Sequence, residues 1–378
     1  MNPNTHRIPS LDGIRAISIA LVIVCHFGRD VGWGDPLDLG SLGVRIFFVI
    51  SGFLITGLLL KELAREGSVN LPRFYFRRTL RIFPAFYFYL ACMLLIASFG
   101  WADLSLKECW TALTYTSNYW VGSLKQLVAH TWSLSTEEQF YLIWPAALAF
   151  AGRKRAPYAL ILLILAGAIS SRVLSARFES SVPAFFNTPI GTGCMLALVR
   201  EPMRRNAVYR AWIESSLGLL LPVVILLANL PGYHSGGVRD AAISWAENVA
   251  IALWIDWAVS KAGTFTGRIL NSRWAISVGV VSYSLYIWQQ PFLELLTGHP
   301  GLLLSGPWKV LANPVARVVM IIAFTCLSYF VVERPLLRLR GWLEPKLFVR
   351  RDAKGEERMA IRVDEPAGSD VKLQGIEV

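Results

Sequence analysis

The sequence predicts an all-α, polytopic membrane protein: a bundle of about ten transmembrane helices with both termini in the cytoplasm. The 378 residues are 54% hydrophobic and only 17% charged, with a mean hydropathy of +0.47, which leaves too little polar surface for a water-soluble domain. Several apolar segments approach the roughly 20 residues that cross about 30 Å of hydrocarbon. Lysine and arginine also gather in alternate loops, as in multi-pass membrane proteins.

Ten apolar segments are expected to span the membrane. In chain order they cover residues 16–27, 42–60, 82–99, 140–151, 158–174, 189–199, 212–230, 241–259, 274–296 and 315–332. The first, fourth and sixth are short, so they must tilt, extend into their flanks or be shielded by neighbouring helices.

Positive charge sets the predicted orientation, because short cytoplasmic loops retain lysine and arginine. Residues 61–81, 153–155, 200–210 and 261–273 are rich in these cations and are placed inside, as are Arg334, Arg338 and Arg340 after the last span. The net charge of +11 is therefore explained by topology and by contact with anionic membrane lipids, and nucleic-acid binding is not predicted. We expect a multi-pass protein of the cell (inner, cytoplasmic) membrane.

One membrane-embedded domain is expected over residues 1–338, followed by a polar, mixed-charge cytoplasmic tail over residues 339–378 that reads as flexible. The five cysteines form no CxxC pair and mostly lie in apolar runs, where cysteine behaves as a small hydrophobe. The sequence therefore predicts no metal site and no disulfide framework.

The first polar group of interest is Arg15 and His26, eleven residues apart in an apolar segment without a helix breaker. Eleven residues advance a helix by about 16.5 Å and turn it about 20° past three revolutions, so both side chains share one face. A substrate along that face would have its anionic end near Arg15 and its reactive end near His26. Alternatively, Arg15 reaches the lipid headgroups and His26 is satisfied by hydrogen bonds between helices.

The second group, residues 74–84 (FYFRRTLRIFP), interleaves cations with aromatic residues at the entrance to a predicted span. Arginine pairs well with phosphate, and aromatic faces stack on nucleobases. A phosphorylated, adenine-bearing cofactor would suit Arg78 and Arg81 in this segment. The alternative is simple anchoring by positive charge at the cytoplasmic face, which explains the arginines but not the aromatic residues.

The third group, residues 130–141 (HTWSLSTEEQFY), leads from an external loop into the fourth predicted span. Ser135 and Glu138 have the spacing of a capping box, so Glu138 is expected to satisfy backbone amides at the start of a helix. Glu137 has no such role and is a candidate for orienting a histidine or binding sugar hydroxyls. Alternatively, it is a solvated acid in the first helical turn.

From about residue 8 to residue 338 the sequence resembles the acyltransferase-3 group of integral-membrane acyltransferases. Residues 8–16 (IPSLDGIRA) with His26 are similar to its opening block, including the Arg-X10-His signature, and residues 78–84 match its RxxRIxP element. Residues 130–141 contain its WSLxxExxFY block. Three further stretches resemble the second-span and closing blocks: residues 43–55 (GVRIFFVISGFLI), 282–288 (SYSLYIW) and 328–335 (SYFVVERP).

The resemblance implies transfer of an acyl group, most often acetyl, from acyl-coenzyme A to a hydroxyl. The implied acceptor is a carbohydrate, a lipid-linked sugar or another envelope or secreted molecule. Transfer needs a base for the acceptor hydroxyl and a clamp for the donor phosphates. We therefore expect His26 and Glu137 to be catalytic, with His26 as the base, Arg15, Arg78 and Arg81 to bind coenzyme A, and Trp132, Ser133 and Tyr141 to shape the acceptor side.

The ninth predicted span departs from the family pattern. Many relatives carry a histidine before the proline, where this chain has Gln289-Gln290-Pro291, and an amide cannot transfer a proton by titrating. Some relatives also carry a fused extracytoplasmic hydrolase-like domain, for which this chain is too short.

Two other functions stay open. One is a transporter or flippase for a lipid-linked sugar or small metabolite, which ten spans and buried charges would permit. Two observations argue against transport: the motif residues gather at the ends of the spans, and the sequence has no visible inverted repeats. The other is an enzyme that exports the acyl group to a separate extracytoplasmic partner. The charges that permit transport are Arg45, Glu247, Asp256, Glu294 and Arg317.

Overall fold

The protein is described by a computed structural model over residues 8–35, 37–121, 124, 126–178, 183–230, 238–293 and 311–348. Every regular element within these residues is helical, so the all-α prediction is confirmed for them. Most of the predicted tail, residues 349–378, lies outside the described residues, and its flexibility stays a prediction. The part of the tail that is described continues a helix to Leu347.

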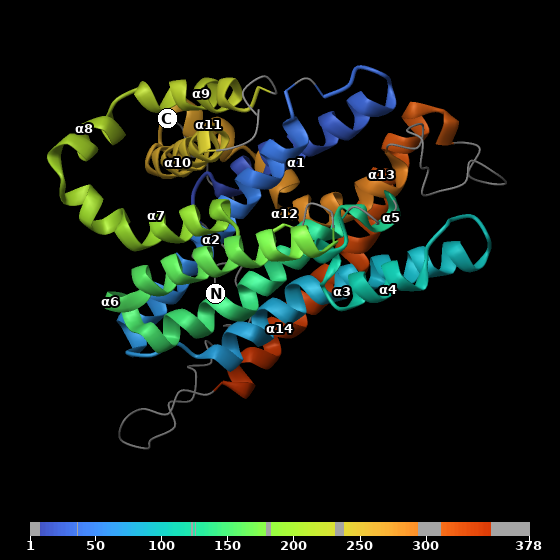
Figure 1. The fold of residues 1–378 in the computed structure, drawn as a ribbon, viewed down its shortest axis with the longest axis horizontal. Coiled ribbons are helices and arrows are strands. Elements are labelled where there is room, and N and C mark those ends of the chain that lie inside the picture. Colours follow the sequence, from blue (N-terminus) through green and yellow to red (C-terminus); the bar gives the residue numbers. More distant parts are fainter. Residues whose placement is uncertain are drawn as a thin grey trace, which may run out of the picture.

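Nine longer helices make up most of the bundle (Figure 1). They are α1 (Leu11–Asp30), α2 (Leu39–Glu66), α3 (Leu71–Ser98), α6 (Thr131–Phe178), α7 (Thr188–Arg205), α10 (Val238–Ser260), α12 (Arg273–Gln289), α13 (Pro314–Leu327) and α14 (Arg334–Leu347). The shorter elements are α4 (Leu106–Leu113), η1 (Ser117–Tyr119), α5 (Gln126–Ala129), α8 (Ala207–Glu214), η3 (Leu217–Leu220), α9 (Leu221–Ala228), α11 (Phe265–Leu270), η5 (Gln290–Phe292) and the π-helical turn η7 (Ser328–Glu333).

Asparagine followed closely by proline fixes the start of three helices. The side chain of Asn70 accepts the Arg73 N–H (3.0 Å) at the start of α3, and Asn187 and Asn313 cap α7 and α13 in the same way. A proline stands at one of the first two positions of each helix, where its missing N–H costs nothing. Local sequence therefore sets where these three helices begin.

The number of spans is supported in part. Five helical runs are long and apolar enough to cross a membrane: Leu11–Asp30, Leu39–Glu66, Leu71–Ser98, Leu127–Arg177 and Pro314–Leu347. A sixth is the pair Ala207–Glu214 and Leu217–Ala228, bent by 68°, if it counts as one span. Within α6 the chain breaks at Gly152 (φ 67°), which separates the two predicted segments 140–151 and 158–174. The total of ten spans and the cytoplasmic termini stay predictions.

The helices that carry the pocket described below pack closely in the middle of the bundle. Helix α2 lies between α1 and α7, and α1 also packs on α12 (Figure 1). A Cβ atom on Gly52 of α2 would stand 2.1 Å from the Ile190 carbonyl oxygen of α7, and one on Gly279 of α12 would stand 2.0 Å from that of Asp12 in α1. Small residues thus allow backbones to touch, as membrane helix pairs commonly do.

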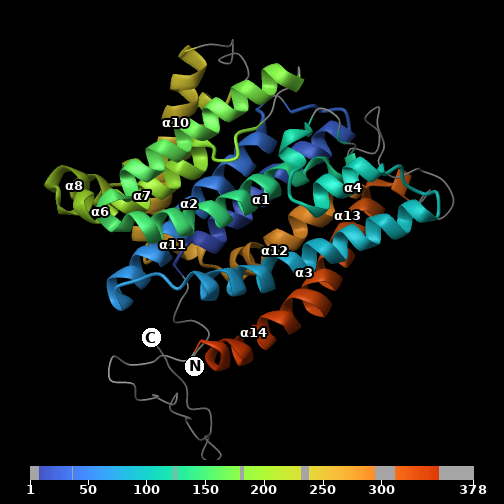
Figure 2. The same cartoon turned by 60° about the horizontal axis from the view of Figure 1, so that its bottom comes forward.

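Helix α14 runs alongside α3 at one edge of the bundle (Figure 2). The Glu344 carboxylate of α14 accepts from Arg73 Nε of α3 at 2.8 Å and also pairs with Arg77. Between α13 and α14, the turn η7 buries Glu333, whose carboxylate accepts from the Ser284 hydroxyl of α12. The C-terminal helices are therefore attached to both α3 and α12.

Buried charges are matched between helices. Asp30 of α1 pairs with Arg317 of α13, and both side chains are almost completely buried. Glu247 pairs with Arg45, and Asp256 of α10 binds Arg200 (2.5 Å) and Arg204 (2.9 Å) of α7. Paired charges at helix contacts suit a fixed bundle, because an uncompensated charge there would be costly. Glu294, also named as a buried charge, lies outside the described residues.

Candidate functional site

A pocket opens between α1, α2, α3, α6 and α12, with an empty volume of about 740 Å³ counting the space at its mouth. Six of the eight predicted site residues line it, whereas His26 and Trp132 do not. The residues that line it are Arg15, Val44, Phe47, Phe48, Ser51, Arg78, Arg81, Ile82, Ser133, Leu134, Glu137, Glu138, Tyr141, Ser282, Tyr283 and Tyr286.

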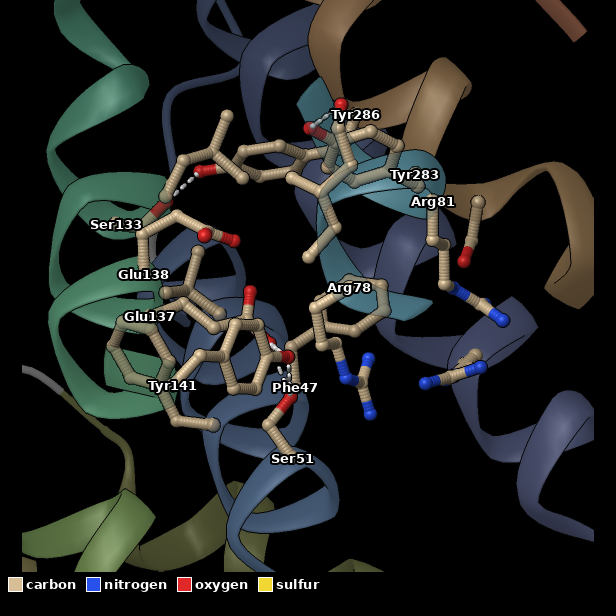
Figure 3. A pocket seen from close by; sticks show the side chains of 16 residues that line it. Phe47, Ser51, Arg78, Arg81, Ser133, Glu137, Glu138, Tyr141, Tyr283 and Tyr286 are labelled. Carbon is tan, nitrogen blue, oxygen red and sulfur yellow. Dashed lines mark hydrogen bonds between the residues drawn. The ribbon is translucent and has the colours of Figure 1, made fainter. Parts of the chain in front are cut away.

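Three guanidinium groups form the arginine wall of the pocket: Arg15 from α1 with Arg78 and Arg81 from α3. Arg78 and Arg81 are three residues apart and so lie on one face of their helix. Both point to the same side of the cavity in Figure 3. The Arg78 guanidinium lies 4.7 Å from the centre of the Tyr141 ring, a cation–π contact that holds it flat against the pocket.

The arginine wall is only weakly neutralised by the protein. Arg15 lies 3.9 Å from the Asp12 carboxylate, and no carboxylate among the described residues lies within 4 Å of Arg78 or Arg81. Three half-buried cations close together repel one another, so a bound anion would relieve that repulsion. Guanidinium groups match the geometry of phosphate oxygens, which makes a phosphorylated ligand the natural occupant.

Two carboxylates stand across the cavity from Arg78 and Arg81, and they differ in their surroundings (Figure 3). Glu137 accepts hydrogen bonds from the hydroxyls of Ser51 and Tyr141, and the Tyr141 hydroxyl also lies 3.3 Å from Ser51 Oγ. Glu138 accepts no hydrogen bond from the described residues, and its carboxylate points into the cavity (Figure 3). Glu137 is thus held in place, whereas Glu138 is available to a ligand.

The capping box predicted for Ser135 and Glu138 is wrong. Helix α6 begins one turn earlier, at Thr131, so both residues lie inside the helix. The Ser135 hydroxyl donates to the Thr131 carbonyl (2.9 Å) and accepts the Ser117 N–H (3.2 Å). Freed from a capping role, Glu138 turns to the pocket, and it is a residue that sequence reasoning missed.

The roof of the pocket is made by Ser133, which was predicted to shape the acceptor side, and by Tyr283 and Tyr286, for which no role was predicted. The hydroxyls of Ser133 and Tyr286 lie 2.6 Å apart, and both donate to the His130 carbonyl, at 3.0 and 3.2 Å. Tyr283 lines the pocket beside them and donates to the Ile82 carbonyl (3.1 Å). The serine and tyrosine pattern of residues 282–288 was the available signal for this roof.

His26 lies on the same uninterrupted helix as Arg15, as predicted, but outside the pocket lining. It is half-buried and lies within electrostatic range of His130. The buried His130 ring packs edge-on against Tyr89 and Tyr286, with ring centres 5.6 Å apart in each case. His130 therefore contacts the roof tyrosine Tyr286 and lies in the neighbourhood of His26.

Trp132 and Gln289 do not line the pocket. Trp132 packs edge-on against Phe48, a lining residue, with ring centres 6.1 Å apart. Gln289 is fully buried, and its amide donates to the Gln290 side chain (3.2 Å). Among the described residues, no cluster of three or more histidine, cysteine or acidic side chains could hold a metal ion.

Comparison with known proteins gives one family match. The profile described as "Acyltransferase domain" matches residues 8–333. No solved structure matches the chain significantly.

Curated relatives are similar over most of this chain. YrhL of Bacillus subtilis is 28% identical over 92% of this chain and 58% of its own length. Peptidoglycan O-acetyltransferase OatA of Listeria monocytogenes is 28% identical over 89% of this chain and 56% of its own length. O-acetyltransferase OatA of Staphylococcus aureus is 27% identical over 89% of this chain and 58% of its own length. The chain thus spans less than three fifths of the length of these relatives.

Proposed function

This chain belongs to the acyltransferase-domain family, and from that premise we propose that it is a membrane O-acetyltransferase acting on a carbohydrate hydroxyl. The proposed donor is acetyl-coenzyme A, which approaches from the cytoplasm. The observation that carries the proposal is the arginine wall, three cations in one pocket of the family domain, of which only Arg15 has a carboxylate within 4 Å among the described residues. Phosphates of the donor would bind there by charge-assisted hydrogen bonds.

Helix α1 carries both Arg15 of the proposed donor site and His26, the proposed base. His26 lies eleven residues beyond Arg15, a rise of about 16.5 Å. A donor whose phosphates bind the arginine wall would extend its thioester along α1, past the hydroxyls of Ser133 and Tyr286. The reacting carbonyl would then lie toward His26, beyond the roof of the pocket.

The reaction needs no redox partner. His26 takes the proton of the acceptor hydroxyl, whose oxygen attacks the thioester carbonyl and forms the new C–O bond. The tetrahedral oxyanion collapses, the C–S bond breaks, and the leaving thiolate receives the proton, giving an acetyl ester and free coenzyme A. Glu137, held by Ser51 and Tyr141, would keep the acceptor side rigid, with Trp132 and Ser133 shaping its wall.

Carbohydrate is the proposed acceptor class because two relatives are named as O-acetyltransferases, one of them of peptidoglycan. Cell-wall glycan or a lipid-linked sugar precursor would supply the hydroxyl, either directly or through a separate extracytoplasmic partner. Transport without bond formation is not favoured. Four of the five charges that would serve a transport pathway are held in ion pairs between helices.

The test is acetyl transfer by purified protein from labelled acetyl-coenzyme A to peptidoglycan fragments, with release of free thiol measured in parallel. Loss of a general base typically costs 10²- to 10⁴-fold in rate, so His26→Ala should lose about that much. Equal transfer by wild type and a folded His26→Ala variant would refute the role of His26. Movement of an acceptor across vesicle membranes without thiol release would refute the enzyme itself.

A further inference from the structure

We propose that Glu138 forms a binding subsite for the amide-bearing arm of the donor thioester, opposite the arginine wall. This inference rests on the proposed function, because it assumes a donor with phosphates at one end and a thioester at the other. In coenzyme A, two secondary amides lie between those ends. Each presents an N–H donor, which a carboxylate oxygen can accept.

The two neighbouring carboxylates of the pocket show why the assignment falls on Glu138. Both lie on α6 and line the same cavity. Glu137 already accepts from two hydroxyls, so its acceptor capacity is largely used inside the protein. Glu138 accepts nothing from the described residues although it is largely enclosed. Its acceptor capacity is therefore available to a ligand that enters the cavity.

The charged side chains of the pocket would determine the orientation of a bound donor. Arg78 and Arg81 face Glu138 across the cavity (Figure 3). A phosphate is attracted to the arginine side, where guanidinium groups can donate to it, and the Glu138 side offers it no cation. A neutral segment that donates hydrogen bonds can bind beside Glu138. The arrangement would therefore orient the donor with its phosphates toward the arginine wall and its amides toward α6.

Aromatic side chains complete the subsite without competing for those hydrogen bonds. Tyr283 lines the pocket, but its hydroxyl is committed to the Ile82 carbonyl. Phe47 lines it as well and contributes only apolar surface. A flexible arm with alternating methylene and amide groups matches a surface that combines apolar side chains with a carboxylate acceptor.

The experiment compares two ligands by isothermal titration calorimetry on the purified full-length protein. Coenzyme A carries the amide arm, and adenosine 3′,5′-bisphosphate carries phosphates and base without it. In Glu138→Met, coenzyme A should bind about tenfold more weakly, which corresponds to about 1.4 kcal/mol, because the acceptor for the amide N–H is lost. The bisphosphate should bind as tightly as to wild type or more tightly, because a like charge is gone. Glu138→Gln, which keeps one acceptor oxygen, should fall between wild type and Glu138→Met for coenzyme A.

The possible results distinguish failure of the Glu138 subsite from failure of the proposed donor. Glu201→Gln is the control, because Glu201 is 69% exposed, pairs with Arg153 and does not line the pocket. If Glu138→Met, with wild-type thermal stability, weakens both ligands equally or neither, the subsite is refuted while the proposed function stands. If wild type binds neither ligand, the coenzyme A donor is refuted together with the subsite.

Discussion

Arg78 shows how much of the site depends on single side chains. It stacks on Tyr141, which in turn donates to Glu137, so the cation and the carboxylate are linked through one ring. Arginine provides a planar fork for phosphate and stacks well on an aromatic face, whereas lysine provides a compact charge that does neither. Charge alone is therefore insufficient at this position.

We predict that Arg78→Lys weakens binding of acetyl-coenzyme A about tenfold and that Arg78→Gln weakens it further, since charge-assisted contacts contribute about 1.5–3 kcal/mol each. KM for acetyl-coenzyme A in the transfer assay is the measurement. Arg77→Gln is the matched control, because Arg77 is its neighbour but is 45% exposed, pairs with Glu344 and does not line the pocket. An equal rise of KM in both variants would show that the effect is not local to the pocket.

At the scale of elements, the contact between α2 and α7 fixes the position of one pocket wall. Ser51, which binds Glu137, immediately precedes Gly52, where the two helix backbones touch. Gly193 makes the reciprocal contact, since a Cβ atom there would stand 2.1 Å from the Val49 carbonyl oxygen. Any side chain at either glycine must push the helices apart.

Gly52→Ala should therefore destabilise the protein by about 1–3 kcal/mol, the usual cost of overpacking. Gly57→Ala, in the same helix, meets nothing within 4 Å and should be neutral or slightly stabilising, because alanine favours helix by about 1 kcal/mol over glycine. Thermal unfolding in one detergent compares the two. Equal melting temperatures for both variants would contradict the close packing of α2 and α7.

The buried pair of Asp30 and Arg317 attaches the end of α1 that carries His26 to α13. Removing one member of a buried pair typically costs about 3–5 kcal/mol, whereas replacing both by apolar residues is often nearly neutral. Arg317→Met should thus lower the melting temperature strongly, and adding Asp30→Leu should recover most of the loss. A double variant less stable than Arg317→Met would show that Asp30 contributes mainly through its other contacts.

At the scale of the whole molecule, one segment predicted inside and one predicted outside lie at opposite ends of the bundle. Helix α8, which follows the cation-rich end of α7, lies far from α4 in both views (Figures 1 and 2). Arg205 at the end of α7 and Lys107 in α4 are both exposed. The positive-inside rule places the first in the cytoplasm and the second outside.

This topology predicts the labelling of single cysteines introduced after the five native cysteines are replaced. A membrane-impermeant maleimide should label Lys107→Cys in intact spheroplasts, and Arg205→Cys only after permeabilisation. Labelling of both positions in intact cells would reject the predicted orientation. The donor could then not reach the pocket as proposed.

Predictions from the sequence were most accurate where the periodicity of an α-helix determines which residues lie together. Arg78 and Arg81 share a helix face because of their spacing, and Arg15 and His26 lie on one helix as expected. It failed for Glu138, since the helix starts one turn before the apparent cap at Ser135. It also could not place His26 relative to the cavity. The rotation of α1 depends on close contacts with other helices at Gly13, Gly43 and Gly279, which no local pattern reveals.

The π-helical turn η7 gives the C-terminal helices a fixed angular offset. A π turn accommodates about one residue more than an α turn, so rewinding all six residues of Ser328–Glu333 as ordinary α-helix would rotate α14 by about 100°. Glu344 would swing away from Arg73 and Arg77, and the hydrogen bond from Ser284 to Glu333 would break. The π turn therefore lets this stretch carry one additional residue while Glu344 still faces α3.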